Sequence, residues 1–492
     1  MVRIHTRELL LVCVGILTLG IVYLFFEISN IADISNFIFF TSLSMLIIIG
    51  AVIKEFSIFS FSRIKVAMLL YWAIGYYVTP LYFLYRGENI DNVQFVYAML
   101  IASVGILSFI LGNSFTFQTV NTPSQKSQIT NLLNNIPALF LTILILFVVT
   151  TIIRVLFVNL GIYSSLFSGG LKNLPISLTI YNALMPFLSI NFLTVPLISW
   201  LYFSNKIGKK QKIILLLMYF TEVIFSFLTL QRFPVIYTLF TPILVGALIN
   251  KVRLKFIHFF ILFIFILVFF YLNNKIRLYL LLLSGYKYDI QLNFRDFIDT
   301  LQGFKDYGEL STDSKLEIVD AFFYRFFDNC YKNLLAIIEK EGDFKLGSTY
   351  LFVFYNFIPR FIWPNKPEFQ LSYDFGLEYG IINSNETVAI TVSRIGEAFM
   401  NFGIVGVMVI LFIWGIVAKV IEESLSKHIL WLYIFFLVNF IIAETFFTNV
   451  FSIVFKQLVY FSIFFILSLL ILELLKVLSH RKIPLHESRI NN

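Results

Sequence analysis

Long apolar runs, separated by short polar segments, recur along nearly the whole chain. A helix needs about 20 apolar residues to cross the roughly 30 Å hydrocarbon core of a bilayer. On that criterion the pattern predicts about twelve transmembrane helices and an all-α, polytopic integral membrane protein. Their predicted ranges are 9–28, 34–53, 66–84, 93–112, 136–158, 181–203, 213–230, 234–250, 256–273, 397–418, 429–449 and 452–475.

Basic residues gather in alternate short loops, which predicts the orientation of the chain, because cytoplasmic loops are enriched in Lys and Arg. The intervening loops hold little more than Arg86, Lys172 and Arg232. We therefore expect both termini in the cytoplasm. The loops assigned to that side carry Arg3, Arg7, Lys54, Arg63, Lys65, Lys126, Lys206, Lys209, Lys210, Lys212, Lys251, Arg253, Lys255, Lys419, Lys427, Lys476, Arg481, Lys482 and Arg489.

Two outer segments are too long to be simple connections, 159–180 and 274–396. The second divides the chain into nine helices (1–273), a large extracytoplasmic loop with short helices (274–396), and three helices with a cytoplasmic tail (397–492). Within the large loop, apolar spacing predicts a helix over 319–339. Three prolines in 358–367 predict an ordered, non-helical turn.

Composition supports a membrane protein and argues against nucleic acid as a partner. The chain is 59% hydrophobic and 13% charged, whereas a soluble globular domain is about 25% charged. The net charge of +8 comes from basic residues in short loops between apolar spans, which the membrane explains better than nucleic acid does. Only two cysteines occur, Cys13 and Cys330, so neither a disulfide framework nor a cysteine metal site is expected.

Several kinds of chemistry have no signature in the sequence. There is no GxxxxGK[ST] phosphate loop, which argues against an ATP-driven pump, and no DxD pair of the kind that holds a divalent metal for a nucleotide-sugar donor. We therefore expect no cofactor and no metal. An outer site would need a carboxylate base, since every histidine maps to the cytoplasmic side. The histidines are His5, His258, His428, His480 and His486.

A few ionisable residues lie where the membrane makes them costly. Arg232 sits in a very short outer turn and Arg154 in the outer third of the fifth span; each either snorkels to the interface or grips a ligand phosphate. Glu222, within the seventh span, has no evident partner in the sequence, which leaves open a neutral, protonated side chain or a role in a polar cavity. Glu444 and Lys456 could neutralise each other as an ion pair with a purely structural role.

Two tracts resemble a known family. Residues 347–367 are GSTYLFVFYNFIPRFIWPNKP and residues 393–406 are SRIGEAFMNFGIVG. They resemble the IPRxxWPxKP and GExxxNFGxxG tracts of bacterial oligosaccharide repeat-unit polymerases of the Wzy type, also called O-antigen polymerases. The turn at Arg232 and the segment 325–328 are shorter matches to the same family.

The resemblance implies a glycosyltransferase in the bacterial inner membrane. Such an enzyme joins undecaprenyl-pyrophosphate-linked oligosaccharides into O-antigen, capsule or exopolysaccharide on the extracytoplasmic face, without nucleotide or metal. The expected partners are that lipid-linked oligosaccharide and the bilayer. A chain-length regulator and a flippase of the same pathway are further candidate partners.

Site residues follow from the resemblance and from side-chain chemistry. Arg232, Arg360 and Arg394 are candidates for stabilising the pyrophosphate leaving group. Glu397 is the candidate base, with a helix-start carboxylate as the alternative, and Asn401, one turn further on, is placed to orient it. Substrate binding is further assigned to Lys366, Trp363, Arg154 and Arg325.

Three other functions stay open at this point. A lipid-linked oligosaccharide flippase also suits twelve spans, although carriers rarely need so large an outer loop and no paired inverted halves are evident. An O-antigen ligase is close in architecture and donor, but an outer-loop histidine is expected in that class and this chain has none there. A non-enzymatic assembly scaffold would tolerate the loss of every outer arginine.

Overall fold

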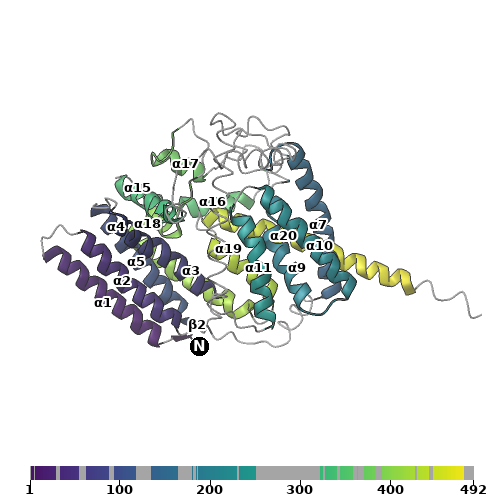
Figure 1. Cartoon of the computed structure of the whole chain (residues 1–492), viewed down its shortest axis with the longest axis horizontal. Coiled ribbons are helices and arrows are strands. Elements are labelled where there is room, and N and C mark those ends of the chain that lie inside the picture. Colours follow the sequence, from purple (N-terminus) through teal and green to yellow (C-terminus); the bar gives the residue numbers. More distant parts are fainter. Residues whose placement is uncertain are drawn as a thin grey trace, which may run out of the picture.

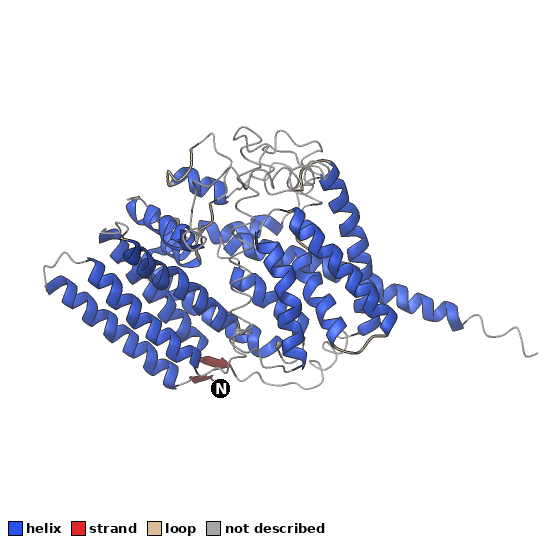
Figure 2. Ribbon diagram, in the orientation of Figure 1, coloured by secondary structure: helices blue, strands red, loops and turns tan. Residues whose placement is uncertain are grey.

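The chain forms a bundle of helices. A computed structural model describes residues 2–4, 6–28, 34–54, 63–87, 93–117, 135–163, 180, 184, 187–229, 232–250, 322–324, 327–340, 344–357, 363, 371–383, 390–426, 429–442 and 447–480. Nearly all of them are helical (Figure 2). Seven helices within this part are long and apolar enough to cross a membrane. The predicted class, a helical membrane protein, agrees with this.

The N-terminal helices lie side by side (Figure 1). Helix α5 packs against α1, α2 and α18 (Arg394–Leu425). A π-helical turn, η2, interrupts what would otherwise be one helix between α3 and α4. The bounds are α1 (Thr6–Ile28), α2 (Ile34–Lys54), α3 (Ile64–Ala73), η2 (Ile74–Val78), α4 (Thr79–Arg86) and α5 (Val93–Asn113).

A second group of helices completes the bundle. Helix α20 packs on α7, and α9 packs on α11, α10 and α19. The last turns of α20 extend beyond the bundle (Figure 1). The bounds are α7 (Ile136–Asn159), α9 (Asn191–Phe203), α10 (Lys209–Leu228), α11 (Arg232–Asn250), α18 (Arg394–Leu425), α19 (Leu430–Ile442) and α20 (Phe447–His480).

Short helices from the segment 274–396 cover one end of the bundle (Figure 1). They are η4 (Asp328–Lys332), α15 (Asn333–Glu339), α16 (Ser348–Phe357) and α17 (Leu371–Glu378). At the opposite end, β1 (Val2–Ile4) pairs antiparallel with β2 (Phe115–Phe117). Residues 322–324, η4 and α15 make up nearly all of the described part of 319–339, which is helical as predicted.

Helices occupy most predicted spans, with two differences. Helix α9 has 13 residues, fewer than the predicted span, and the described helical residues of the predicted span 429–449 are divided between α19 and the start of α20. A turn at 189–190 precedes α9, and the predicted span contains Pro186, which lacks the backbone donor that a helix needs. The predicted span 256–273 lies outside the described residues.

Charged groups tie together the helix ends that the orientation assigned to the cytoplasm. Lys65, at the start of α3, pairs with Glu8 of α1 at 2.5 Å, and Arg63 pairs with Glu422 of α18 at 3.4 Å. The β1–β2 pair joins the N-terminus to the end of α5. These ends share one side of the bundle, as the predicted topology requires.

Glycines allow α5 and α18 to approach closely. A Cβ added at Gly112 would lie 1.9 Å from the carbonyl oxygen of Phe412, and one at Gly415 would lie 2.3 Å from that of Phe109. Beside them, Asn113 Nδ2 donates to the carbonyl oxygen of Gly415 at 3.1 Å. Small residues permit such backbone contact between membrane helices.

Gly112→Ala is therefore expected to destabilise the protein by about 1–3 kcal/mol, because α5 and α18 must separate to admit the methyl group. Thermal melting in detergent measures the effect. Gly50→Ala in α2 is the matched control, since a Cβ there meets nothing within 4 Å. Equal melting temperatures for the two variants would contradict the close packing.

Candidate functional site

Helix α18 is broken near its start. Phe402 (φ −141°, ψ 15°) and Gly403 (φ 63°, ψ −155°) are not helical, so a short helix ending at Asn401 precedes the long one. Only glycine adopts the conformation of Gly403 without strain. A Cβ there would also lie 2.8 Å from Phe344 Cζ. The glycine of the NFG sequence thus marks a break in the helix.

The segment before α16 donates hydrogen bonds to the backbone carbonyls that this break leaves without helical partners. The amides of Lys345 and Leu346 donate to the carbonyl oxygens of Met400 and Asn401 at 3.1 and 3.0 Å. The amide of Gly347 donates to Asn401 Oδ1 at 3.0 Å. Carbonyls at a helix end need such partners when water is excluded. The segment 345–347 is thereby fixed to the short helix.

A chain of polar side chains runs from this contact to Glu397. Asn401 Nδ2 lies 2.8 Å from Thr349 Oγ1 and 2.8 Å from the carbonyl oxygen of Glu397. Thr349 Oγ1 in turn lies 2.8 Å from Glu397 Oε1. Asn401 lies one turn beyond Glu397 on the same face, as predicted. We refer to Glu397, Thr349 and Asn401 as the Glu397 cluster.

The second oxygen of Glu397 binds the start of α20. Oε2 accepts a hydrogen bond from the backbone amide of Phe447 at 2.7 Å. Glu397 is 1% exposed, and its carboxylate connects α18, α16 and α20. A buried carboxylate needs such donors, because an uncompensated buried charge costs several kcal/mol.

Arg394 lies one turn before Glu397. Ser393 caps the helix by accepting from the amide of Gly396 at 3.0 Å. The guanidinium of Arg394 is 1% exposed and stands 4.7 Å above the ring of Trp414. Cation–π contact stabilises a desolvated guanidinium by about 2 kcal/mol. A permanent positive charge is therefore held inside the bundle next to the Glu397 cluster.

Aromatic rings enclose the cluster. Phe447 contacts Trp414 and Tyr350, at ring-centroid distances of 5.4 and 5.8 Å. Tyr350 also lies parallel to Phe402 at 6.4 Å. Burial, and next the nearby charge of Glu397, raise the pKa of Tyr350 above its ordinary value, so its phenol stays protonated.

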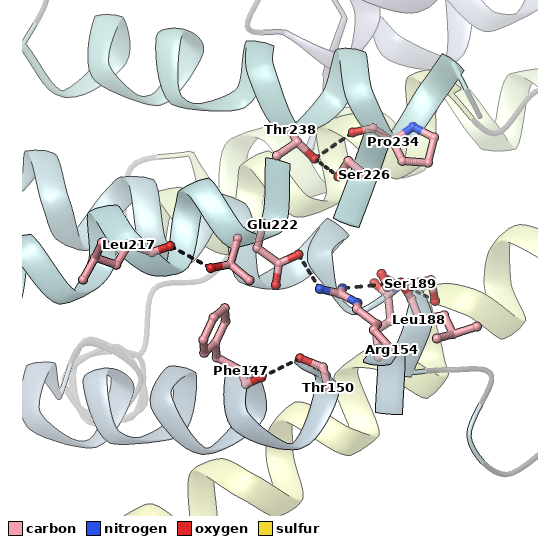
Figure 3. A network of polar contacts seen from close by, with 12 residues as sticks. Phe147, Thr150, Arg154, Leu188, Ser189, Leu217, Glu222, Ser226, Pro234 and Thr238 are labelled. Atoms are coloured by element: carbon pink, nitrogen blue, oxygen red, sulfur yellow. Dashed lines mark hydrogen bonds and ion pairs between the residues drawn. The ribbon is translucent and has the colours of Figure 1, made fainter. Parts of the chain in front are cut away.

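Arg154 of α7 points toward Glu222 of α10 (Figure 3) and, among the described residues, forms no hydrogen bond or ion pair with the Glu397 cluster. Its Nη1 lies 2.7 Å from Glu222 Oε2, and both side chains are 1% exposed. Its guanidinium also lies 5.5 Å from the ring centroid of Phe225. Glu222, for which no partner was evident from the sequence, is therefore paired with Arg154. Arg154 neither snorkels to the interface nor presents a net charge for a phosphate, because Glu222 neutralises it.

The structure describes only some of the remaining predicted site residues. Arg232 begins α11, but its side chain lies outside the described atoms. Trp363 is half-buried and not helical. Arg360, Lys366, Arg325 and the carboxylate of the Glu444–Lys456 pair lie outside the described residues. Within the described part of the chain, no three His, Cys, Asp or Glu side chains gather as metal ligands.

Sequence reasoning missed Thr349, Trp414 and the amide of Phe447. Thr349 stands in the first resembling tract, but a single threonine there carries no chemical signal of its own. Trp414 lies on an apolar helix face and is indistinguishable by pattern from a packing residue. A backbone donor has no signature in the sequence.

Comparisons with known proteins add one match. A family described as Domain of unknown function (DUF8712) matches residues 338–483. The matched region contains Arg394 and the whole Glu397 cluster. No curated protein matches the chain. No solved structure matches it either.

Proposed function

We propose that the protein is a polymerase of lipid-linked oligosaccharide repeat units. In this proposal it has about twelve spans, lies in a bacterial inner membrane with both termini in the cytoplasm, and works on the extracytoplasmic face. Its substrate is an undecaprenyl-pyrophosphate-linked repeat unit, and its product is O-antigen, capsule or exopolysaccharide.

The main support is that the two tracts resembling the polymerase family meet in one cluster. Gly347 and Thr349 belong to the first tract, and Glu397 and Asn401 to the second. They are joined by hydrogen bonds of 2.8 to 3.0 Å. Residues about fifty positions apart in the chain thus form one polar centre around a carboxylate, as a shared site requires.

The surface beside the cluster suits an amphiphilic substrate. Leu346 is 76% exposed and Phe354 is 66% exposed, and both flank the segment that carries Thr349. Leu346 is also hydrogen-bonded through its amide to Asn401. A lipid-linked sugar needs an apolar surface for its carrier next to polar groups for its head.

In the proposed reaction, an acceptor sugar hydroxyl attacks the anomeric carbon of the growing chain. A new carbon–oxygen bond forms there, and the bond to the pyrophosphate oxygen breaks. Glu397 takes the hydroxyl proton, and undecaprenyl pyrophosphate leaves as an anion. The bonds from Thr349 and Phe447 fall on different oxygens of the carboxylate, and each carboxylate oxygen can accept more than one hydrogen bond.

Positive charge beside the leaving group supplies the electrostatic part of catalysis. Arg394 is already held next to the cluster, and Arg232 and Arg360 are proposed to complete the set with Lys366. Trp363 and Arg325 are proposed to contact the sugars or the pyrophosphate. A chain-length regulator and a flippase are proposed partners in the same pathway.

Arg232→Ala and Arg360→Ala are each expected to insert normally but to stop chain elongation. Each loses a charge-assisted contact of about 1.5–3 kcal/mol, and more where charge develops in the transition state. A deletion strain complemented with each variant is compared by gel, where elongation gives a ladder. The expected product is a single lipid-linked repeat unit. Lys476→Ala, on the exposed end of α20, is the control and is expected to keep the ladder. Long polymer from both arginine variants would show that neither arginine takes part in the mechanism.

A further inference from the structure

The direction of each hydrogen bond in the Glu397 cluster follows from a single backbone group. The amide of Gly347 can only donate, and it lies 3.0 Å from one end of the Asn401 side chain. That end must be the carbonyl oxygen. The Asn401 NH₂ group therefore faces Thr349 Oγ1, at 2.8 Å, and can only donate to it.

Thr349 has one hydroxyl proton to donate, and Glu397 Oε1 lies within hydrogen-bond distance of it. Since Oγ1 accepts from Asn401, its proton points to Glu397 Oε1 at 2.8 Å. Glu397 Oε2 is held by a second fixed donor, the amide of Phe447, at 2.7 Å. Two donors whose directions are set by the fold thus hold the two oxygens of the carboxylate.

We propose that Thr349 is a positioning residue for Glu397, and that Asn401 acts through it. This inference rests on the proposed function, because it assumes that Glu397 takes a proton from the acceptor. Thr349 comes from the outer segment, whereas Glu397 belongs to α18. The Glu397 carboxylate is therefore correctly oriented only when the amides of Lys345, Leu346 and Gly347 fix this segment to the broken helix.

The hydroxyl, rather than the shape of the side chain, carries this role. Valine has nearly the shape of threonine without its hydroxyl, so Thr349→Val leaves the packing in place but removes the donor to Glu397 and the acceptor for Asn401. Serine keeps both functions and loses only a methyl group. The two variants therefore separate orientation from packing.

The experiment measures chain elongation by the purified full-length protein in vesicles, with undecaprenyl-pyrophosphate-linked repeat unit as the probe. Thr349→Val is expected to lower kcat about 100-fold with KM within about twofold, because the carboxylate is misplaced while substrate contacts remain. Thr349→Ser is expected to stay within about threefold of the unchanged protein in kcat.

Thr142→Val is the matched control. Thr142 is a buried threonine in α7 whose hydroxyl also has two partners, the carbonyl oxygen of Ala138 and Ser468 Oγ. The Thr142→Val variant loses similar hydrogen bonds at a place away from the Glu397 cluster, so we expect its elongation rate to equal that of the unchanged protein.

The outcomes distinguish this inference from the proposed function. If neither the unchanged protein nor Thr142→Val elongates the probe, the proposed function is wrong. If both elongate it and Thr349→Val matches them, the positioning role is wrong. A loss confined to KM, or an equal loss in Thr349→Ser, would also overturn it, because either points to substrate contact or shape instead of the hydroxyl.

Discussion

If the proposed function holds, we expect Glu397→Gln to lower chain elongation about 10²–10⁴-fold, the usual contribution of a positioned general base. The amide has nearly the size and shape of the carboxylate, but it cannot take up the acceptor proton. Its remaining oxygen can still accept from the amide of Phe447, and its NH₂ group can face Thr349, so the helices stay in place. The measurement is the rate of polymer formation per inserted molecule.

The control for loss of negative charge is Glu473→Gln. Glu473 lies on the exposed end of α20 and pairs with Lys476, so its loss is expected to change neither insertion nor elongation. Elongation by Glu397→Gln at the rate of Glu473→Gln would remove the carboxylate from the chemistry and leave it a helix-positioning role.

Arg154→Met is expected to cost about 3–5 kcal/mol of stability, because it leaves the carboxylate of Glu222 buried without its partner. Both side chains are 1% exposed and the pair is joined at 2.7 Å, so solvent cannot replace the guanidinium. The melting temperature in detergent measures the loss.

The double variant Arg154→Met/Glu222→Met separates pairing from the function of either charge. Replacing a whole buried pair by apolar side chains of similar size is often neutral or stabilising, so we expect the double variant to recover most of the stability and to keep elongating. If the double variant melts as low as the single one, the ion pair is not the cause. If it is stable but inactive, Arg154 binds substrate after all.

Apolar runs predicted the helical class and most of the helix positions, because backbone groups in lipid must be satisfied within each helix. The same pattern does not reveal where a helix breaks. Phe402 and Gly403 lie within a continuous apolar run, and their conformation depends on Phe344 and the amides of 345–347, which come from a distant part of the chain.

For the candidate site, sequence spacing predicted the relation of Asn401 to Glu397, since one helical turn separates them. It did not predict that Thr349 completes the cluster, because that contact depends on how the segment before α16 packs against α18. The pairing of Arg154 with Glu222 was missed for the same reason. Charges 68 positions apart meet only through the packing of α7 and α10.

The most direct test of the account is reconstitution of the purified protein in vesicles with undecaprenyl-pyrophosphate-linked repeat unit. Mass spectrometry of the products then reports every new glycosidic bond. A polymerase yields chains of two or more repeats and releases undecaprenyl pyrophosphate without added nucleotide. Repeat units that only change leaflet, or that stay single while the protein is folded, would contradict the proposed function.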